Sequence, residues 1–231
     1  MAPKRSNKDK GLTSMYKCLE TGAFSDLIIT CGNKTWNAHR VVVCPKSSFF
    51  RAACNGNFKE AATGVINLED DNPLVVKLMM EYFYKDWYTI GKLPAGSPST
   101  LSVHIQVHRL GDKYGIEELC DLADGLYCKY LRREASFEEY VASIPEVYQP
   151  PVSEHLRQSA TNHARELMGK NFFTDEWRTI LKRVMKEIPE FCFDVIEAVF
   201  TAPIPILCEE CRDEQINIGM DSCHVCGVIL E

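Results

Sequence analysis

The C-terminal segment of the chain, residues 208–231, contains two C-x-x-C pairs separated by eleven residues. A tight turn at each pair directs two thiolates at one metal ion, and two such turns complete the tetrahedron that Zn²⁺ prefers. Gly227 follows the second pair, where a side chain would crowd the backbone N–H groups that approach sulfur. The spacing therefore predicts a structural Zn²⁺ site with four thiolate ligands: Cys208, Cys211, Cys223 and Cys226.

The other cysteines are scattered singly through apolar segments, where a free thiol behaves as a small hydrophobe. The basic residues 1–10 are not followed by the apolar stretch of a secretory signal, so we expect a reducing compartment, the nucleus or the cytoplasm. Disulfides are disfavoured there, which leaves metal binding or redox chemistry for the two pairs. A redox pair uses one C-x-x-C beside a βαβ pattern, which is lacking here. Another metal, no metal, and His224 as a substitute ligand stay open as alternatives.

A site closed by four thiolates has no open position for water or substrate, so we expect a structural rather than a catalytic metal. Residues 208–231 carry six acidic side chains and a single arginine, and the whole chain has a net charge of −6. Phosphate would be repelled by this segment, so direct nucleic-acid binding is not expected. The segment is predicted to stabilise the fold or to contact a protein.

The 231 residues are enough for one or two domains, and 45% hydrophobic with 25% charged residues is typical of a globular protein. No apolar run reaches the roughly 18 residues that a membrane helix needs, so no membrane association is expected. Residues 1–11 are predicted to be a disordered basic tail, with a weak nuclear-import signal as the alternative.

Alternating apolar residues predict a β-hairpin with strands over residues 27–31 and 36–39, and a third strand over residues 64–68. A short helix is expected near residues 12–21, and another begins at the Ser47-Ser48 pair and ends at Gly56. Residues 74–84 are apolar nearly all round, which predicts a buried helix. Two further helices, over residues 100–133, are separated at Gly115.

The order of A-H-R-V-V-V, S-S-F-F, F-K-E and I-N-L-E-D-D-N-P, followed by an apolar helix, resembles the BTB/POZ domain over about residues 15–133. Residues 103–123 and the paired-cysteine tail are similar to short filamentous-fungal BTB proteins. The resemblance implies an α+β fold, a small mixed sheet flanked by helices, followed by a helical extension and a zinc knuckle. The predicted parts are a tail (1–11), the BTB/POZ domain (12–133), the extension (134–203) and the knuckle (204–231).

Within the extension, the sequence predicts helices over residues 137–147, 153–172, 174–188 and 189–202, which would form a small bundle. Pro145, Pro150 and Pro151 are expected to separate this bundle from the BTB/POZ part. The extension has no kelch-like repeat to hold a substrate, which weakens the interpretation as a ligase adaptor. No phosphate loop, nucleophile elbow or dinucleotide fingerprint is found, so an enzyme is not expected.

BTB domains are protein-interaction modules that self-associate, and many link a cullin scaffold to a substrate in ubiquitin ligases. The resemblance therefore implies a non-enzymatic interaction module that forms homodimers or binds a partner. One alternative is a substrate adaptor of a cullin-RING ubiquitin ligase. Another is a transcription-associated factor that acts through protein contacts.

The same resemblance identifies candidate partner-binding residues. Phe58 and Glu60 match the hydrophobic-x-Glu pattern of cullin-binding BTB domains, with the ring as apolar anchor and the carboxylate at the rim; alternatively, Phe58 closes the domain's own core. Asp26 and Arg40 match an acid and a base near the family's dimer interface, unless Asp26 only caps a turn and Arg40 is solvated.

Three histidines could in principle do chemistry. His39 has no metal or nucleophile partner in the sequence, so a satisfied core histidine is favoured over a catalytic one. His104 and His108 lie four residues apart on a predicted helix, a spacing that can hold a metal. Packing is favoured here too, because the glutamate of a metalloprotease pattern is lacking.

Overall fold

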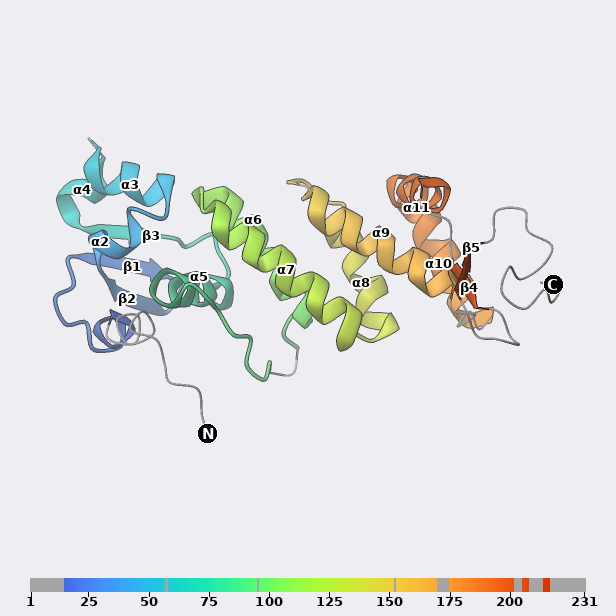
Figure 1. The fold of residues 1–231 in the computed structure, drawn as a ribbon. Helices are drawn as coiled ribbons and strands as arrows, with labels where there is room; N and C mark the ends of the chain where they lie inside the picture. The colour runs from blue at the N-terminus through green and yellow to red at the C-terminus, as the bar shows by residue number, and fades with distance from the viewer. Residues whose placement is uncertain are drawn as a thin grey trace. The chain divides into compact units, whose positions relative to one another are not determined.

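The computed structural model describes residues 15–56, 58–94, 96–151, 153–169, 175–201, 205–207 and 214–216 (Figure 1). The chain divides into two compact units, Met1–Leu126 and Tyr127–Glu231, and the divide falls within a single helix, α7 (Glu117–Arg133). Each unit is described separately below.

The first unit contains a three-stranded mixed sheet in the order β2-β1-β3. The strands β1 (Leu27–Cys31) and β2 (Lys34–Ala38) form the predicted antiparallel hairpin, and β3 (Val65–Asn67) pairs with β1 in parallel. Ile29 lies opposite Trp36 on one side and Ile66 on the other. Alternate residues of β1 are buried, so the hydrophobic pattern fixes the register of the hairpin.

Helices surround this sheet. Residues 15–21 are helical, and the predicted helices are found as α3 (Ser48–Asn55), α5 (Pro73–Lys85) and α6 (Thr100–Tyr114), followed by α7. Two short helices were not predicted: α2 (Arg40–Val43) and α4 (Lys59–Thr63).

Local signals fix the ends of the long helices. At the start of α5, the Asn72 side chain accepts a hydrogen bond from the Leu74 N–H, and Pro73 occupies the first turn. Gly115 separates α6 from α7 with φ of 62°, the left-handed conformation that glycine adopts without steric cost. Buried side chains of α5 pack with the sheet and with Phe50, whose ring contacts Phe83 edge-on.

The second unit is helical, with α8 (Phe137–Val147), α9 (Glu154–Gly169), α10 (Asp175–Glu187) and α11 (Pro189–Thr201). A short antiparallel pair follows, β4 (Pro205–Leu207) and β5 (Glu214–Ile216). The predicted separator Pro145 lies inside α8 rather than between elements. The buried Tyr140 hydroxyl donates to the Ala160 carbonyl at 2.8 Å, which ties α8 to α9.

None of the helices in the described ranges combines the length and the apolar character that crossing a bilayer requires.

Candidate protein-interaction site

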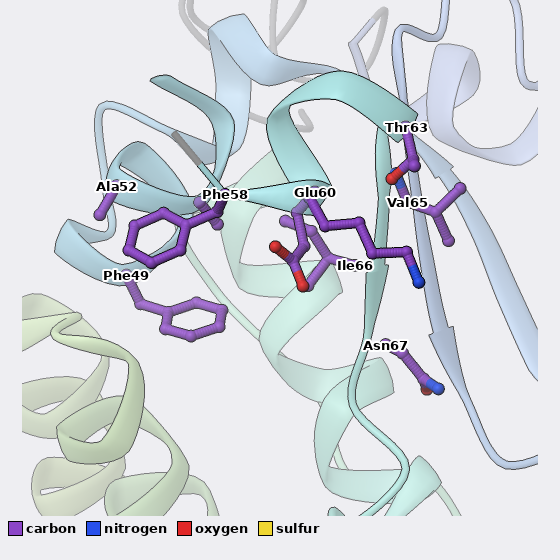
Figure 2. A pocket seen from close by; sticks show the side chains of 10 residues that line it. Phe49, Ala52, Phe58, Glu60, Thr63, Val65, Ile66 and Asn67 are labelled. Atoms are coloured by element: carbon purple, nitrogen blue, oxygen red, sulfur yellow. The ribbon is translucent and has the colours of Figure 1, made fainter. Parts of the chain in front are cut away.

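A pocket of about 580 Å³ opens between α3, α4 and β3 in the first unit (Figure 2). Apolar side chains dominate its lining, and a few polar groups border it. Its lining includes Phe49 and Ala52 of α3, Phe58 and Glu60 at the start of α4, and Val65 and Ile66 of β3. We call this pocket the Phe49–Phe58 groove.

Phe58 lies on the surface rather than in the core. Its side chain is 60% exposed and takes the N-cap position of α4 without capping the helix itself. A methyl group built on Gly56 would come within 2.7 Å of the Phe58 ring, so the glycine allows the ring to fold back toward the end of α3. Figure 2 shows the Phe58 ring above that of Phe49, at the same end of the groove. Phe58 therefore does not close the core.

Phe49 is a groove residue that the sequence analysis does not identify as a candidate for binding. Phe49 and Phe50 are adjacent in α3, so only one of them can face the core. Phe50 is fully buried, while Phe49 is 39% exposed and rests on Tyr114 with a ring-centroid distance of 4.7 Å. The paired phenylalanines are the signal that could have indicated an exposed aromatic residue.

Glu60 supplies the negative charge of the groove. It is half-buried in the first turn of α4, where the partial positive charge of the helix N-terminus stabilises a carboxylate. Figure 2 shows its carboxylate beside the two rings. An apolar surface next to a carboxylate suits a partner that offers an apolar side chain close to a cation.

Asp26 and Arg40 are brought together, but through the main chain. The Asp26 carboxylate accepts a hydrogen bond from the Arg40 backbone N–H at 2.8 Å, and so caps the start of α2. The Arg40 guanidinium points elsewhere. It donates to the Cys54 carbonyl at 3.4 Å and to the Ala61 carbonyl at 3.3 Å.

These two carbonyls lie near the C-terminal ends of α3 and α4, where helices carry partial negative charge and lack internal donors. Arg40 therefore bridges the two helices on either side of the loop that carries Phe58. Its Nε atom is buried with no hydrogen-bond partner in the part of the chain that the structure describes. This geometry gives Arg40 the role of holding together α3 and α4, the two helices that line the groove.

Replacing Arg40 with methionine is expected to lower the free energy of unfolding by about 2 kcal/mol, because two carbonyls lose a charged donor. Urea denaturation of the wild type and the variant measures this difference. Arg51→Met is the matched control, since the exposed Arg51 also donates to two carbonyls, those of Cys44 and Pro45. Equal losses of unfolding free energy in the two variants would contradict the bridging role of Arg40.

The three histidines are held by partners in the core. His39 Nε2 lies 2.8 Å from the Ala23 carbonyl, which can only accept, so Nδ1 accepts from the Tyr84 hydroxyl at 2.7 Å. This confirms the prediction of a satisfied core histidine. His104 Nδ1 lies 2.7 Å from the Tyr88 hydroxyl, and His108 Nδ1 lies 2.7 Å from a carboxylate oxygen of Asp124.

The predicted zinc ligands Cys208, Cys211, Cys223 and Cys226 lie outside the described residues. Among the residues that are described, no group of three or more histidine, cysteine or acidic side chains is arranged to hold a metal ion. The zinc site stays a prediction from the sequence.

A small mixed sheet flanked by helices carries an apolar surface groove, a combination that suits contact with another protein. The BTB/POZ domain model matches residues 15–131, and the chain belongs to this family. The match confirms the predicted domain type.

Several known proteins are similar to parts of the chain. The human protein "Kelch repeat and BTB domain-containing protein 4" is 37% identical over 70 residues, which is 30% of this chain and 13% of that protein. The mouse "TD and POZ domain-containing protein 1" is 26% identical over 71% of this chain and 41% of its own length. The chain thus spans less than half of the length of each of these two relatives.

Among solved structures, the BTB domain of zebrafish PATZ1 matches with a TM-score of 0.42 and 12% identity, over 56% of this chain and 99% of that one.

Proposed function

We propose that the chain is a non-enzymatic interaction module that binds a helical segment of a partner protein at the Phe49–Phe58 groove. The observation that carries the proposal is the exposure of Phe58 at the mouth of an apolar pocket of about 580 Å³. Exposed aromatic anchors beside a well-formed pocket are the usual centre of binding energy in protein interfaces.

The first candidate partner is the amino-terminal domain of a cullin, which would make the chain an adaptor of a ubiquitin ligase. Two features support this choice: the Phe58-Lys59-Glu60 match to cullin-binding BTB domains, and the similarity to a kelch-repeat BTB protein. In this arrangement the Phe58 ring enters a groove on a cullin helix, and Glu60 contacts a cation at the rim.

Phe58→Asp is expected to weaken binding to a cullin amino-terminal domain at least about 30-fold, because a charge replaces the anchor in a desolvated contact. Biolayer interferometry with the immobilised cullin domain measures the affinity. The matched control is Phe24→Asp, which makes the same change at an exposed phenylalanine outside the groove.

A wild-type chain that fails to bind the cullin domain would exclude that partner. If the Phe58→Asp variant still binds the cullin domain with unchanged affinity, the contact lies outside the groove. Self-association stays a prediction of the family resemblance, and light scattering on the same samples measures it.

A further inference from the structure

Helix α11 has two apolar faces, and the described residues cover only one of them. Phe191 and Val195 are buried against the rest of the second unit. On another side of the same helix, Phe193 is 71% exposed, Ile196 is 46% exposed and Phe200 is 81% exposed. A helix on the surface of a globular protein normally has one apolar stripe, so a second stripe indicates a missing partner.

The three exposed side chains follow the spacing of a helix–helix seam. Positions 193, 196 and 200 are i, i+3 and i+7, which places them in one row along a single side of the helix. The same spacing aligns the apolar positions of a coiled coil, where each side chain inserts between residues of a facing helix. The row is about 10 Å long, at 1.5 Å of rise per residue.

One edge of this row is acidic. Glu190 and Glu197 are exposed, seven residues apart, and both lie on the same side of the row by helical geometry. Helix α11 contains no lysine, arginine or histidine. Neither carboxylate has an ion pair or a hydrogen bond within the described ranges, whereas Asp194 of the same helix is paired with Arg157 at 2.7 Å.

We infer that the Phe193–Ile196–Phe200 face of α11 binds an amphipathic helix of another protein whose apolar stripe is flanked by lysine or arginine. Charges at the edge of a helical seam select the partner, and opposite charges favour pairing. A second copy of α11 packed antiparallel would place Glu190 and Glu197 beside the same carboxylates of its mate, and like charges oppose that pairing. The face is a separate site from the Phe49–Phe58 groove.

The test uses two synthetic helical peptides of about 20 residues, a length that can be helical in water. Both carry leucine at the seam positions; one has lysine at the flanking positions and the other has glutamate. Fluorescence anisotropy against the full chain at low salt is expected to show at least tenfold tighter binding of the lysine peptide. Phe193→Ser combined with Phe200→Ser should weaken that binding at least tenfold.

Charge reversal gives the sharper result. Glu190→Lys combined with Glu197→Lys is expected to invert the preference, so that the glutamate peptide binds more tightly. Phe58→Asp should leave both affinities unchanged, which separates this site from the groove. All substitutions are at exposed positions, and circular dichroism verifies that each variant keeps its helical content.

Three results would overturn the inference. Equal binding of the two peptides, with no response to charge reversal, would show that the acidic edge does not contribute to recognition. A dimer in light scattering that Phe193→Ser dissociates would make a second copy the occupant. A monomeric wild-type chain that binds neither peptide would mean that the face does not accept a helix.

Discussion

Acidification from pH 7 to pH 4.5 is expected to cost the Met1–Leu126 unit about 2–3 kcal/mol of unfolding free energy through His104 alone. His104 is buried in α6, and burial lowers its pKa from 6.5 to about 4 because the imidazolium would lose its hydration. Each unit of pKa difference between the folded and unfolded states corresponds to about 1.4 kcal/mol.

The sign follows from proton uptake. Between pH 6.5 and pH 4 the unfolded chain binds a proton at His104 that the folded chain does not, so acid favours unfolding. The contribution of His104 is fully present above pH 6.5 and is lost as the pH falls toward 4. His108 acts in the opposite direction: burial lowers its pKa, but the Asp124 carboxylate, the Cys120 backbone and Asp112 together outweigh burial, so the net pKa is raised. Its stabilisation is present below pH 6.5 and is lost as the pH rises.

Urea denaturation at pH 7 and pH 4.5 separates the two histidines. His104→Asn keeps a polar atom near the Tyr88 hydroxyl but removes the titration, so the pH dependence should shrink by about 2–3 kcal/mol. His108→Asn should increase the pH dependence of the unfolding free energy, because the opposing contribution of His108 is removed. His155→Asn, at an exposed position of the other unit, is the control. An unchanged pH dependence in His104→Asn would show that the burial of this ring does not govern the acid response.

Much of the first unit follows from local patterns. Alternation over Leu27–Cys31 predicts the strand β1, and the Asn72 cap with Pro73 predicts the start of α5. The short helices α2 and α4 escape the sequence because four or five residues hold barely one helical turn, too few for a 3.6-residue period. Neither has a side-chain N-cap of its own to mark where it begins.

The candidate site is less predictable. The resemblance to a family identifies Phe58 and Glu60, but the exposure of Phe49 depends on which of two neighbouring rings the core accepts. The destination of the Arg40 side chain could not be predicted either. The carbonyls that it reaches lie 14 and 21 residues away along the chain, and only the folded arrangement of α3 and α4 brings them near.

The burial of side chains on helix α11 is also only partly predictable from the sequence. A recurrence every four residues correctly predicts that Phe191 and Val195 are buried. Val199 continues this recurrence yet is only half-buried, and the recurrence does not indicate the second row that contains Phe193 and Phe200. An apolar residue on a helix indicates burial, but the pattern does not say whether the covering surface belongs to the same chain.

Purified under reducing conditions, the full chain is expected to contain about one zinc ion per molecule, and Cys208→Ser combined with Cys223→Ser should reduce this to near zero. The substitutions remove one thiolate from each C-x-x-C pair, so neither turn can still supply two ligands. Elemental mass spectrometry of protein freed of loosely bound metal measures the ratio. Acid should also release the ion, since the cysteine thiols must lose their protons to bind it.

The control is Cys18→Ser combined with Cys128→Ser, which removes two half-buried thiols outside the pairs and should leave the zinc content unchanged. Zinc that survives the loss of Cys208 and Cys223 would place the ligands among the other cysteines. A wild-type chain without zinc would overturn the metal site and favour redox chemistry at the two pairs. A four-thiolate site predicts a single ion with a structural role, because all four positions of the tetrahedron are taken by protein ligands.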